Sequence, residues 1–424
     1  MSKDNKYIPS GYKPSPLGII PEEWEVKRLG EIFTFKNGVN AGKDSYGEGV
    51  RFVNTMDVLN NEYITGKILR GRVAINEKTK NEFLVSFGDV LFNRTSETRE
   101  EVGCSTVYLD NEDAVFGGFV IRAREIDTNI LKPRFKQYCF QPSYIRNQIS
   151  ALGNGAIRYN LGQEDLSKVN LLIPTKVEQE AIVSVISLWD TAIAKQTALI
   201  EQLTLRKRGL MQQLLTGKKR LNGFGGEWKR IKLGDIAERI TRKNEEDNQN
   251  VVTISAQRGF VVQTDFFNKS VASETLDNYF LVHKDEFCYN KSYSNGYPMG
   301  AIKRLKTFDK AVVTTLYICF ALKSETTTSI DFFEQYCESG ILNNELVKVA
   351  NEGGRAHGLL NVTPFAFFNM HMSIPSINEQ NAIASVLVNA DKEIEIQKQK
   401  LAALQEQKKG LMQVLLTGKK RINK

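Results

Sequence analysis

The sequence lacks any apolar run close to the ~18 to 20 residues that a helix needs to cross a bilayer. Its opening stretch, MSKDNKYIPSGYKPSPLG, contains no apolar core of the kind found in secretory signals, so we expect no export. Apolar residues make up 41% of the chain and charged residues 25%, which is typical of a globular protein. We therefore expect a soluble, cytoplasmic protein that does not contact a membrane.

Cysteine and histidine are scarce. The five cysteines lie far apart and form no C-x-x-C pair, which argues against a disulfide framework and against a zinc ribbon. The three histidines, His283, His357 and His371, have no partner at helical spacing, so neither a catalytic zinc nor a Ser-His-Asp triad is expected. The sequence predicts no metal site.

Motifs that bind nucleotides or position a methyl acceptor are also missing. The nearest approach to a phosphate-binding G-x-x-x-x-G-K-[ST] loop is GVNAGKD at residues 38–44, which has the wrong spacing and an aspartate where the hydroxyl should be. No Pro-Pro pair occurs, so an Asn/Asp-Pro-Pro-aromatic tetrapeptide is absent. Asp89 and Glu97 lack the acid-x-Lys pattern that accompanies nuclease carboxylates. We expect no catalytic residue and no cofactor site in this chain.

What the chain does contain is a long internal repeat. GLMQQLLTGKKR at residues 209–220 returns as GLMQVLLTGKKR at residues 410–421, an offset of 201 positions. The same offset aligns the segments that begin IPTKVEQEAI and IPSINEQNAI. This period far exceeds the roughly 20 to 50 residues of solenoid units, so it indicates duplication of a whole domain plus connector. We expect two domains, each with its own core, in a pseudo-two-fold internal repeat.

Each copy carries a long, proline-free helical pattern, at residues 178–217 in the first, with apolar residues that step by four and three. A helix of about 40 residues extends roughly 60 Å at 1.5 Å per residue. Because of the pseudo-two-fold relation, we expect the helices to pair antiparallel as a coiled coil that separates the two domains. The expected seam residues are Ile182, Ile186, Trp189, Ile193, Ile200, Leu203, Leu210, Leu214, Ile383, Leu387, Ile394, Leu401, Leu404, Leu411 and Leu415.

Two polar positions interrupt this seam in each copy: Gln196 and Lys207 in the first, repeated as Gln397 and Lys408. A polar group in an apolar seam costs stability but penalises wrong registers, since a slipped partner would leave it buried without a mate. The alternative is that these positions lie at the solvated margin of a short contact. The sequence leaves both interpretations open.

The segments outside the helices, about 17–172 and 223–373, contain short β-branched and apolar runs separated by Gly, Asn and Asp, which favours mixed sheets. Residues 132–149 and 329–347 have the periodicity of amphipathic helices at matching places in the two copies. The predicted fold class is therefore α+β, with two α/β domains and two long antiparallel coiled-coil helices. A formal charge of +8 suits a polyanionic partner, although many basic proteins never bind nucleic acid.

Together these features resemble the specificity subunits of type I restriction-modification enzymes, over nearly the whole chain. The features that carry the resemblance are PLGIIPEEWEVKRLGEIF (16–33), GDVLFNRTS (88–96), the two I-P-x-x-x-x-E-Q-x-A-I helix starts and the repeated GLMQxLLTGKKR. Singly these motifs are loose, but their order and duplication are specific.

The resemblance implies target-recognition domains at residues 1–172 and 222–373, and conserved helical spacers at 173–221 and 374–424. Each domain would read one half of an asymmetric, bipartite double-stranded DNA target. The paired helices would set the gap and dock two modification (methyltransferase) subunits; complete complexes of the family add two restriction subunits. These prokaryotic partners, and not this chain, would use S-adenosylmethionine, ATP and Mg²⁺.

Base reading needs Arg, Lys, Asn, Gln, Ser or Thr side chains on exposed loops, because these match the donors and acceptors in the grooves. Asn93, Asn160, Asn290 and Asn361 have a competing interpretation as structural turn or cap residues. The expected DNA-binding residues are Asn93, Arg94, Thr95, Ser96, Arg99, Arg158 and Tyr159 in the first copy, and Lys291, Ser292, Tyr293, Arg355 and His357 in the second.

Two further classes of function compete with this hypothesis. A standalone DNA nuclease or methyltransferase with similar recognition domains would need an added catalytic region, and no segment of the sequence is spare. A coiled-coil structural adaptor would account for the heptads but not for two divergent, folded inserts.

Overall fold

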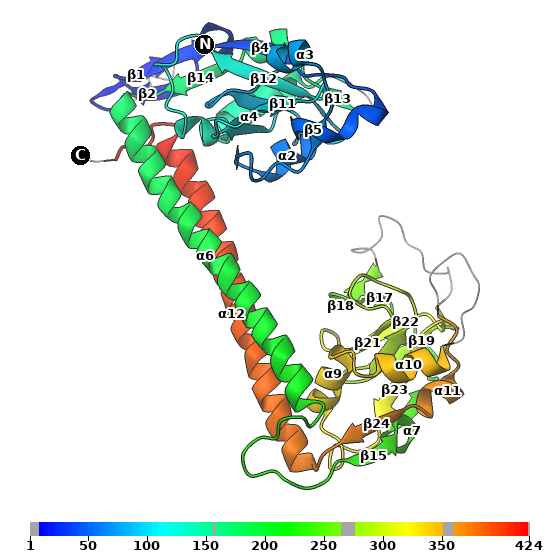
Figure 1. Ribbon diagram of the computed structural model, residues 1–424. Coiled ribbons are helices and arrows are strands. Elements are labelled where there is room, and N and C mark those ends of the chain that lie inside the picture. The colour runs from blue at the N-terminus through cyan, green and yellow to red at the C-terminus, as the bar shows by residue number, and fades with distance from the viewer. Residues whose placement is uncertain (1–7, 156–157, 264–275, 351–359, 423–424) are drawn as a thin grey trace. The chain divides into compact units, whose positions relative to one another are not determined.

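The computed structural model describes residues 8–155, 158–263, 276–350 and 360–422, and it divides into two compact units (Figure 1). Unit 1 comprises residues 1–195 and 400–424, and unit 2 comprises residues 196–399. Each unit thus combines one mixed α/β domain with parts of both long helices. Among the residues that the structure describes, no helix has both the length and the apolar character of a membrane span.

Unit 1 is built around a five-stranded sheet of order β4-β12-β8-β10-β6, antiparallel except at the β10–β6 edge. Every residue of β8 is buried, because helices and a second, three-stranded sheet (β11-β5-β7) cover its neighbours. The strands are β1 (Tyr12–Ser15), β2 (Gly18–Pro21), β3 (Glu25–Arg28), β4 (Phe33–Asn37), β5 (Tyr46–Val53), β6 (Tyr63–Ile64), β7 (Arg72–Val73), β8 (Val90–Asn93), β9 (Thr95–Ser96), β10 (Ser105–Tyr108), β11 (Ala114–Phe116), β12 (Val120–Glu125), β13 (Tyr159–Asn160) and β14 (Asn170–Ile173). The helices are α1 (Leu29–Ile32), α2 (Thr55–Asn60), α3 (Glu77–Glu82), α4 (Ser143–Leu152) and α5 (Gln163–Ser167).

Unit 2 repeats part of this plan. Its sheet β16-β23-β20-β21 has the order of β4-β12-β8-β10, and Cys288 opposite Cys319 corresponds to Leu91 opposite Arg122. The strands are β15 (Lys229–Lys232), β16 (Ala237–Ile240), β17 (Val252–Ser255), β18 (Gly259–Val262), β19 (Phe280–His283), β20 (Phe287–Asn290), β21 (Ala301–Arg304), β22 (Lys310–Val313), β23 (Ile318–Leu322) and β24 (His371–Ile374). The helices are α7 (Leu233–Ile236), α9 (Ile330–Glu338), α10 (Asn343–Val349) and α11 (Pro364–Phe368). The predicted α+β class with two domains is confirmed.

The two long helices, α6 (Lys176–Leu214) and α12 (Ile377–Leu415), have 39 residues each. The repeated Thr-Gly stop ends both, because Gly217 and Gly418 adopt the left-handed conformation with φ of 70°. A Cβ at either glycine would lie 3.3 Å from the ring of a tryptophan, Trp228 at Gly217 and Trp24 at Gly418. Each helix end is therefore packed under the first segment of a domain.

Within each unit, a half of α6 runs antiparallel beside a half of α12 (Figure 1). The same two ion pairs hold the helices together in both units, with the donor and acceptor helices exchanged. The pairs are Arg421–Glu178 (2.8 Å) and Lys408–Asp190 (2.6 Å) in unit 1, and Arg220–Glu379 (2.6 Å) and Lys207–Asp391 (2.5 Å) in unit 2. The duplication has thus preserved a set of helix contacts, which we call the repeated ion pairs.

The seam between the helices is packed at its ends and partly exposed in its middle. Gln196 is only 6% exposed and donates to the side chain of Gln397 (2.8 Å), and Lys408 is 9% exposed, so these polar positions are buried and paired. A lone helix pair covers little of its own middle, which leaves several expected seam residues only half-buried. Buried are Ile182, Ile186, Leu214, Ile383, Leu387, Ile394 and Leu415; partly exposed are Trp189, Ile193, Ile200, Leu203, Leu210, Leu401, Leu404 and Leu411.

The two predicted amphipathic helices are each broken. Residues 132–142 form only a short 3-10 turn, and α4 begins after Pro142, which has no backbone N–H to continue a preceding helix. Residues 329–347 divide into α9 and α10 at Gly340, whose φ is 75°. The prediction of single helices was wrong because periodicity alone ignored these two residues.

Candidate nucleic-acid interface

Strands β8 and β20 end in equivalent segments that carry most of the expected DNA-binding residues. In unit 1, the backbone N–H of Leu161 donates to the carbonyl oxygen of Arg94 (2.9 Å), and β13 pairs with β9. In unit 2, the N–H of Leu360 donates to the carbonyl oxygen of Lys291 (3.0 Å). The structure therefore brings the loop after β8 together with the loop before α5, two segments that are some 60 residues apart in the chain.

Several of the expected residues are occupied inside the fold. The side chain of Asn93 is fully buried and donates to the carbonyl oxygen of Glu101, so it presents no surface to DNA. Ser96 is 7% exposed and donates to the carboxylate of Glu101 (2.7 Å). The side-chain oxygen of Asn290 accepts from the backbone N–H of Ser292 (3.0 Å). These contacts match the structural interpretation of the two asparagines.

Arg94 and Thr95 are half-buried next to this turn. The guanidinium of Arg94 donates to the carbonyl oxygen of Gly118 (3.1 Å), and the hydroxyl of Thr95 donates to the side-chain oxygen of Asn160 (2.8 Å). Backbone hydrogen bonds hold both ends of each contact, so the two side chains have little rotamer freedom left to lose when they meet a ligand.

The cations on the surface of unit 1 lie beside the same turn. Arg99 is exposed, with its guanidinium carbon 5.2 Å from the ring centre of Tyr159. The side chain of Arg158 is 62% exposed and lies 3.7 Å from the carboxylate of Glu97. An exposed ion pair of this length contributes little stability, which leaves the guanidinium available for a phosphate. The arrangement offers two exposed cations around a fixed polar turn.

In unit 2 the equivalent turn is positively charged at its base. Burial, followed by the positive charge of Arg239, lowers the pKa of Lys291 below its usual value. No carboxylate pairs with Lys291 among the residues that the structure describes, so an incoming anion would relieve this repulsion. Tyr293 is 64% exposed nearby in the chain. Arg355 and His357, also expected to bind DNA, lie outside the described residues.

The two carboxylates that the sequence offered as possible nuclease metal ligands, Asp89 and Glu97, have other partners in the structure. Asp89 accepts three hydrogen bonds from the guanidinium of Arg124 (2.6, 3.0 and 3.2 Å) and is almost fully buried. Glu97 lies beside Arg158. Within the described parts of the chain, no three histidine, cysteine or acidic side chains gather as a metal site would require.

Sequence reasoning did not single out Asn40, which the structure places at the candidate interface. Asn40 is exposed, and a Cβ built on Gly118 would lie 1.9 Å from its side-chain oxygen. Its amide therefore lies directly against the turn that Arg94 binds. The available signal was the Gly117-Gly118 pair, since adjacent glycines in a strand region mark a close approach of another segment.

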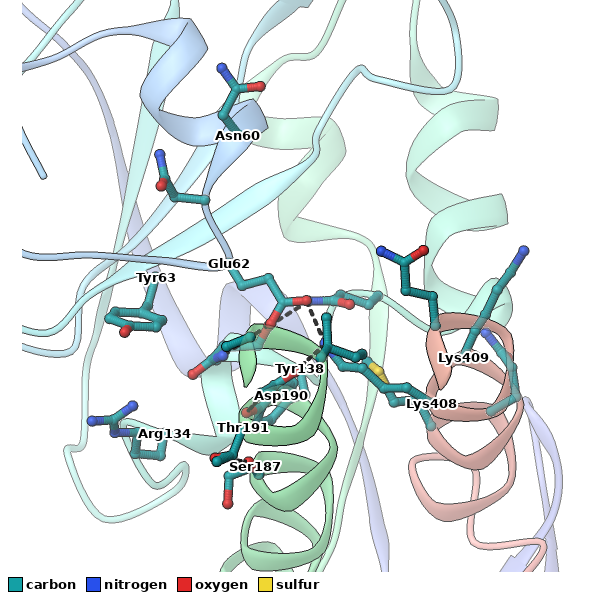
Figure 2. Close-up of a pocket in the computed structure, with 18 of the residues that line it drawn as sticks. Asn60, Glu62, Tyr63, Arg134, Tyr138, Ser187, Asp190, Thr191, Lys408 and Lys409 are labelled. Carbon is teal, nitrogen blue, oxygen red and sulfur yellow. Dashed lines mark hydrogen bonds and ion pairs between the residues drawn. The ribbon is translucent and has the colours of Figure 1, made fainter. Parts of the chain in front are cut away.

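A groove of about 980 Å³ lies between the α/β domain of unit 1 and the long helices of the same unit (Figure 2). The ammonium of Lys408 bridges Glu62 of the domain and Asp190 of α6, both at 2.6 Å, and the hydroxyl of Tyr138 donates to Asp190 (2.5 Å). Burial lowers the pKa of Lys408, but hydrogen bonds to Asp190 and Glu62 outweigh it and the net shift is upward. This cluster fixes the domain against the helices of its own unit.

Comparisons with known proteins agree with one another. The family model for the type I restriction modification DNA specificity domain matches residues 21–205 and 225–406. The chain is 24% identical over 451 residues to the putative type I restriction enzyme MjaX specificity subunit of Methanocaldococcus jannaschii, covering 98% of both chains. It is 23% identical over 434 residues to the type I restriction enzyme MjaVIII specificity subunit of the same organism, covering 95% of this chain and 94% of that one.

A solved structure described as "Structural basis underlying complex assembly and conformational transition of the type I R-M system" is also similar. Its TM-score is 0.57 at 15% identity, over 94% of this chain and 99% of that chain. At this level of identity the likeness shows a shared fold.

Proposed function

Because the chain belongs to the type I restriction modification DNA specificity family, we propose that each of its two units reads one half of an asymmetric, bipartite double-stranded DNA target. As a member of this specificity family the chain is a non-catalytic subunit. In our proposal, partner subunits would methylate and cut the DNA. We place the recognition domains at residues 1–172 and 222–373, and the helical spacers at 173–221 and 374–424. The spacers would set the gap of unread base pairs between the half-sites.

The observation that carries this proposal is a shared scaffold with unlike side chains. In both units the third strand of the shared sheet order, β8 or β20, ends in an asparagine followed by a cation, and a backbone hydrogen bond from a leucine holds the carbonyl oxygen of that cation. Beyond that point the residues diverge: Thr95-Ser96 in unit 1 against Ser292-Tyr293 in unit 2. Equivalent positions with different donors and acceptors would read different base edges. Two unlike half-sites follow.

Charge at the two turns supports binding to DNA. Arg94, Arg99 and Arg158 in unit 1, and Lys291 with Arg239 in unit 2, would neutralise phosphates and release counterions. The proposed contacts in unit 1 are Arg94, Thr95, Arg99, Arg158 and Tyr159, and in unit 2 Lys291, Ser292, Tyr293, Arg355 and His357.

The helices offer surfaces for the partner proteins. Leu188 in unit 1, and Leu205 and Ile396 in unit 2, are each about 60 to 69% exposed on the long helices. Exposed apolar side chains on such helices support docking of two modification subunits, with two restriction subunits in a complete complex. These partners would bind S-adenosylmethionine, ATP and Mg²⁺.

The test is to express the chain with and without its modification subunits in a host that lacks DNA methylation, followed by long-read sequencing. We expect methylated adenine in one asymmetric split motif, and only when both components are present. Methylation by the chain alone would favour a standalone enzyme, and an unchanged methylome with assembled partners would favour a structural adaptor.

Binding measurements on the purified complex locate the interface. Arg94→Ala and Lys291→Ala should each weaken binding to the target about ten- to a hundredfold, as loss of a base or phosphate contact does. Arg28→Ala and Lys284→Ala are the controls: Arg28 is exposed and precedes α1, and Lys284 is exposed and precedes β20 at the end of that strand remote from Asn290. Equal losses in the controls would contradict the proposed interface.

A further inference from the structure

Both units expose a large apolar side chain at the same point of the fold. Phe119 is 61% exposed in unit 1, and Leu316 is 59% exposed in unit 2. Phe119 directly precedes β12, in which Val120 is opposite Asn93, and Leu316 lies two residues before β23, in which Ile318 is opposite Tyr289. Continuing the β20–β23 register by one residue sets Tyr317 against Asn290, as Val120 is set against Asn93. Phe119 and Leu316 therefore occupy equivalent positions, although the sequences around them have diverged.

The local geometry is the same in both cases. The backbone N–H of Val120 donates to the carbonyl oxygen of Gly117 (2.8 Å), and that of Tyr317 donates to the carbonyl oxygen of Thr314 (3.3 Å). Phe119 and Leu316 are each the third residue of a four-residue turn. Gly, Asn, Asp and Ser dominate such turns, so a large apolar residue there has to be explained. One exposed apolar residue is ordinary in a protein, but its recurrence at an equivalent turn is not.

The turn in unit 1 is held rigidly against the candidate interface. The backbone N–H of Arg94 donates to the carbonyl oxygen of Phe119 (2.9 Å), and its guanidinium donates to the carbonyl oxygen of Gly118. The N–H of Gly118 donates to the carbonyl oxygen of Val39 (2.9 Å). The phenyl ring thus projects from a fixed backbone beside a cation and the exposed amide of Asn40, so little entropy is lost when it meets a ligand.

We propose that Phe119 and Leu316 each make an apolar contact with the C5-methyl group of a thymine in the major groove of the half-site read by their own unit. This inference rests on the proposed DNA-binding turns. The thymine methyl is the only apolar group that an unmodified base edge presents in that groove, and apolar side chains are its natural partners. The flanking cations would hold the backbone while the ring or isobutyl group contacts the methyl.

A core role and a wedge between base pairs both fit these two side chains less well. The exposure of Phe119 and Leu316 excludes a role in the core. A wedge between base pairs would also use an apolar residue. Removing a wedge would weaken binding equally to any sequence that bends, whereas removing a methyl contact would weaken binding only where one particular base is thymine. Removing the methyl group alone therefore separates a wedge from a methyl contact.

The experiment uses the complex of this chain with its modification subunits and a DNA duplex that carries the target motif found by methylome sequencing. Its affinity is measured for this duplex and for duplexes in which deoxyuridine replaces one thymine at a time. Phe119→Ala should bind the thymine target about tenfold more weakly. One deoxyuridine in half-site 1 should weaken the unaltered complex by a similar factor and leave Phe119→Ala unaffected. Leu316→Ala should behave in the same way with one position in half-site 2.

Phe87→Ala is the matched control: Phe87 is 52% exposed and precedes β8 at the end of that strand remote from Asn93. Its affinity should be unchanged. The inference fails if Phe119→Ala binds normally, if it loses affinity equally for thymine and deoxyuridine targets, or if it assembles poorly with the modification subunits. Measuring Arg94→Ala in parallel separates the failures, since an unaffected Arg94→Ala would overturn the proposed interface itself.

Discussion

Unit 1 and unit 2 agree where their domains meet the long helices and differ where their domains end in turns. The repeated ion pairs recur residue for residue, and so does the glutamine that follows Glu178 in unit 1 and Glu379 in unit 2. Gln179 accepts from the N–H of Lys132, and Gln380 accepts from the N–H of Ser329, so each ties a helix start to its domain. No comparable identity exists between the turns at Arg94 and Lys291.

The difference teaches which part of the molecule carries geometry and which part carries specificity. Ion pairs and caps that set how a domain meets its helices tolerate little change, because one lost partner leaves a half-buried charge unpaired. Side chains on turns that reach a ligand can vary without loss of the scaffold. Duplication followed by divergence of the turns alone would yield two domains with the same scaffold and different DNA-binding side chains.

The largest effect is expected from changing the helices while leaving both turns intact. One heptad inserted in α6 beside Gln196 and one in α12 beside Gln397 would lengthen the spacer by about 10 Å, or at most about three base pairs. Methylation of the original target should be lost, and any new target should keep both half-sites with a longer gap. Long-read sequencing measures this, and a seven-residue replacement without insertion is the control. Methylation that persists at the original target would show that the length of the helices does not set the gap between the half-sites.

The next effect concerns a difference within the repeated ion pairs. Lys408 meets two carboxylates, Glu62 and Asp190, whereas Asp391 is the one carboxylate that Lys207 meets within the described part of the chain. Asp391 also accepts from the side-chain amide of Gln335 (2.7 Å). Lys408→Met should lower the free energy of unfolding by roughly 1 to 3 kcal/mol, a range reduced for solvent screening of the partly exposed carboxylates. Lys207→Met should cost about half as much, because Asp391 keeps one donor.

Urea denaturation with hydrogen exchange in each unit measures both costs. Adding Glu62→Gln to Lys408→Met should recover part of the loss, since two carboxylates would no longer face each other without a cation. A larger cost for Lys207→Met would show that the extra carboxylate of unit 1 contributes nothing.

The long helices could be predicted from the sequence, but the arrangement of the turns at Arg94 and Lys291 could not. The repeat and the long helices follow from local periodicity, which occurs twice in the chain. Periodicity left open whether the polar seam positions are buried, and the structure buries Gln196 and Lys408. The breaks at Pro142 and Gly340 were readable, yet apolar periodicity outweighed them in the prediction. The closeness of Arg94 to Gly118 and Asn40 depends on strand pairing between distant segments, which no local pattern encodes.

The expected DNA-binding residues show the same limit. The sequence analysis chose all four residues from Asn93 to Ser96 because their side chains suit base reading and they are adjacent. The structure buries Asn93 and Ser96 and leaves only Arg94 and Thr95 partly exposed. Phe119 escaped notice because apolar residues in β-rich segments are expected in a core.

A smaller effect is expected at acid pH. Burial raises the pKa of Glu178, but hydrogen bonds from Arg421, Trp24 and Thr175 outweigh it and lower the pKa below its usual 4.5. Stability from this group is thus present above about pH 4.5 and is lost as the pH falls through the lowered value. Glu178→Gln should lower the Tm at pH 7, and the difference from the unaltered chain should shrink towards pH 3. A difference that stays constant with pH would mean that the carboxylate charge is not the cause.

The smallest effect is expected at the glutamine pair. Gln196→Leu alone should cost about 1 kcal/mol, because it leaves the partly buried amide of Gln397 without the side chain of Gln196 as its partner. Leucine at both positions should restore or raise the Tm, as replacing a buried polar pair by apolar residues often does. Thermal unfolding of Gln196→Leu, Gln397→Leu and the double variant measures this. A double variant less stable than Gln196→Leu would show that the glutamine pair contributes to stability and does not serve only to fix the register of the helices.

The central claim is that each unit reads its own half-site independently of the other. The most direct measurement replaces residues 17–172 by the corresponding segment of another specificity subunit and sequences the methylome with the modification subunits present. We predict that one half of the motif changes while the other half and the gap stay as they were. A change in both halves would contradict the account.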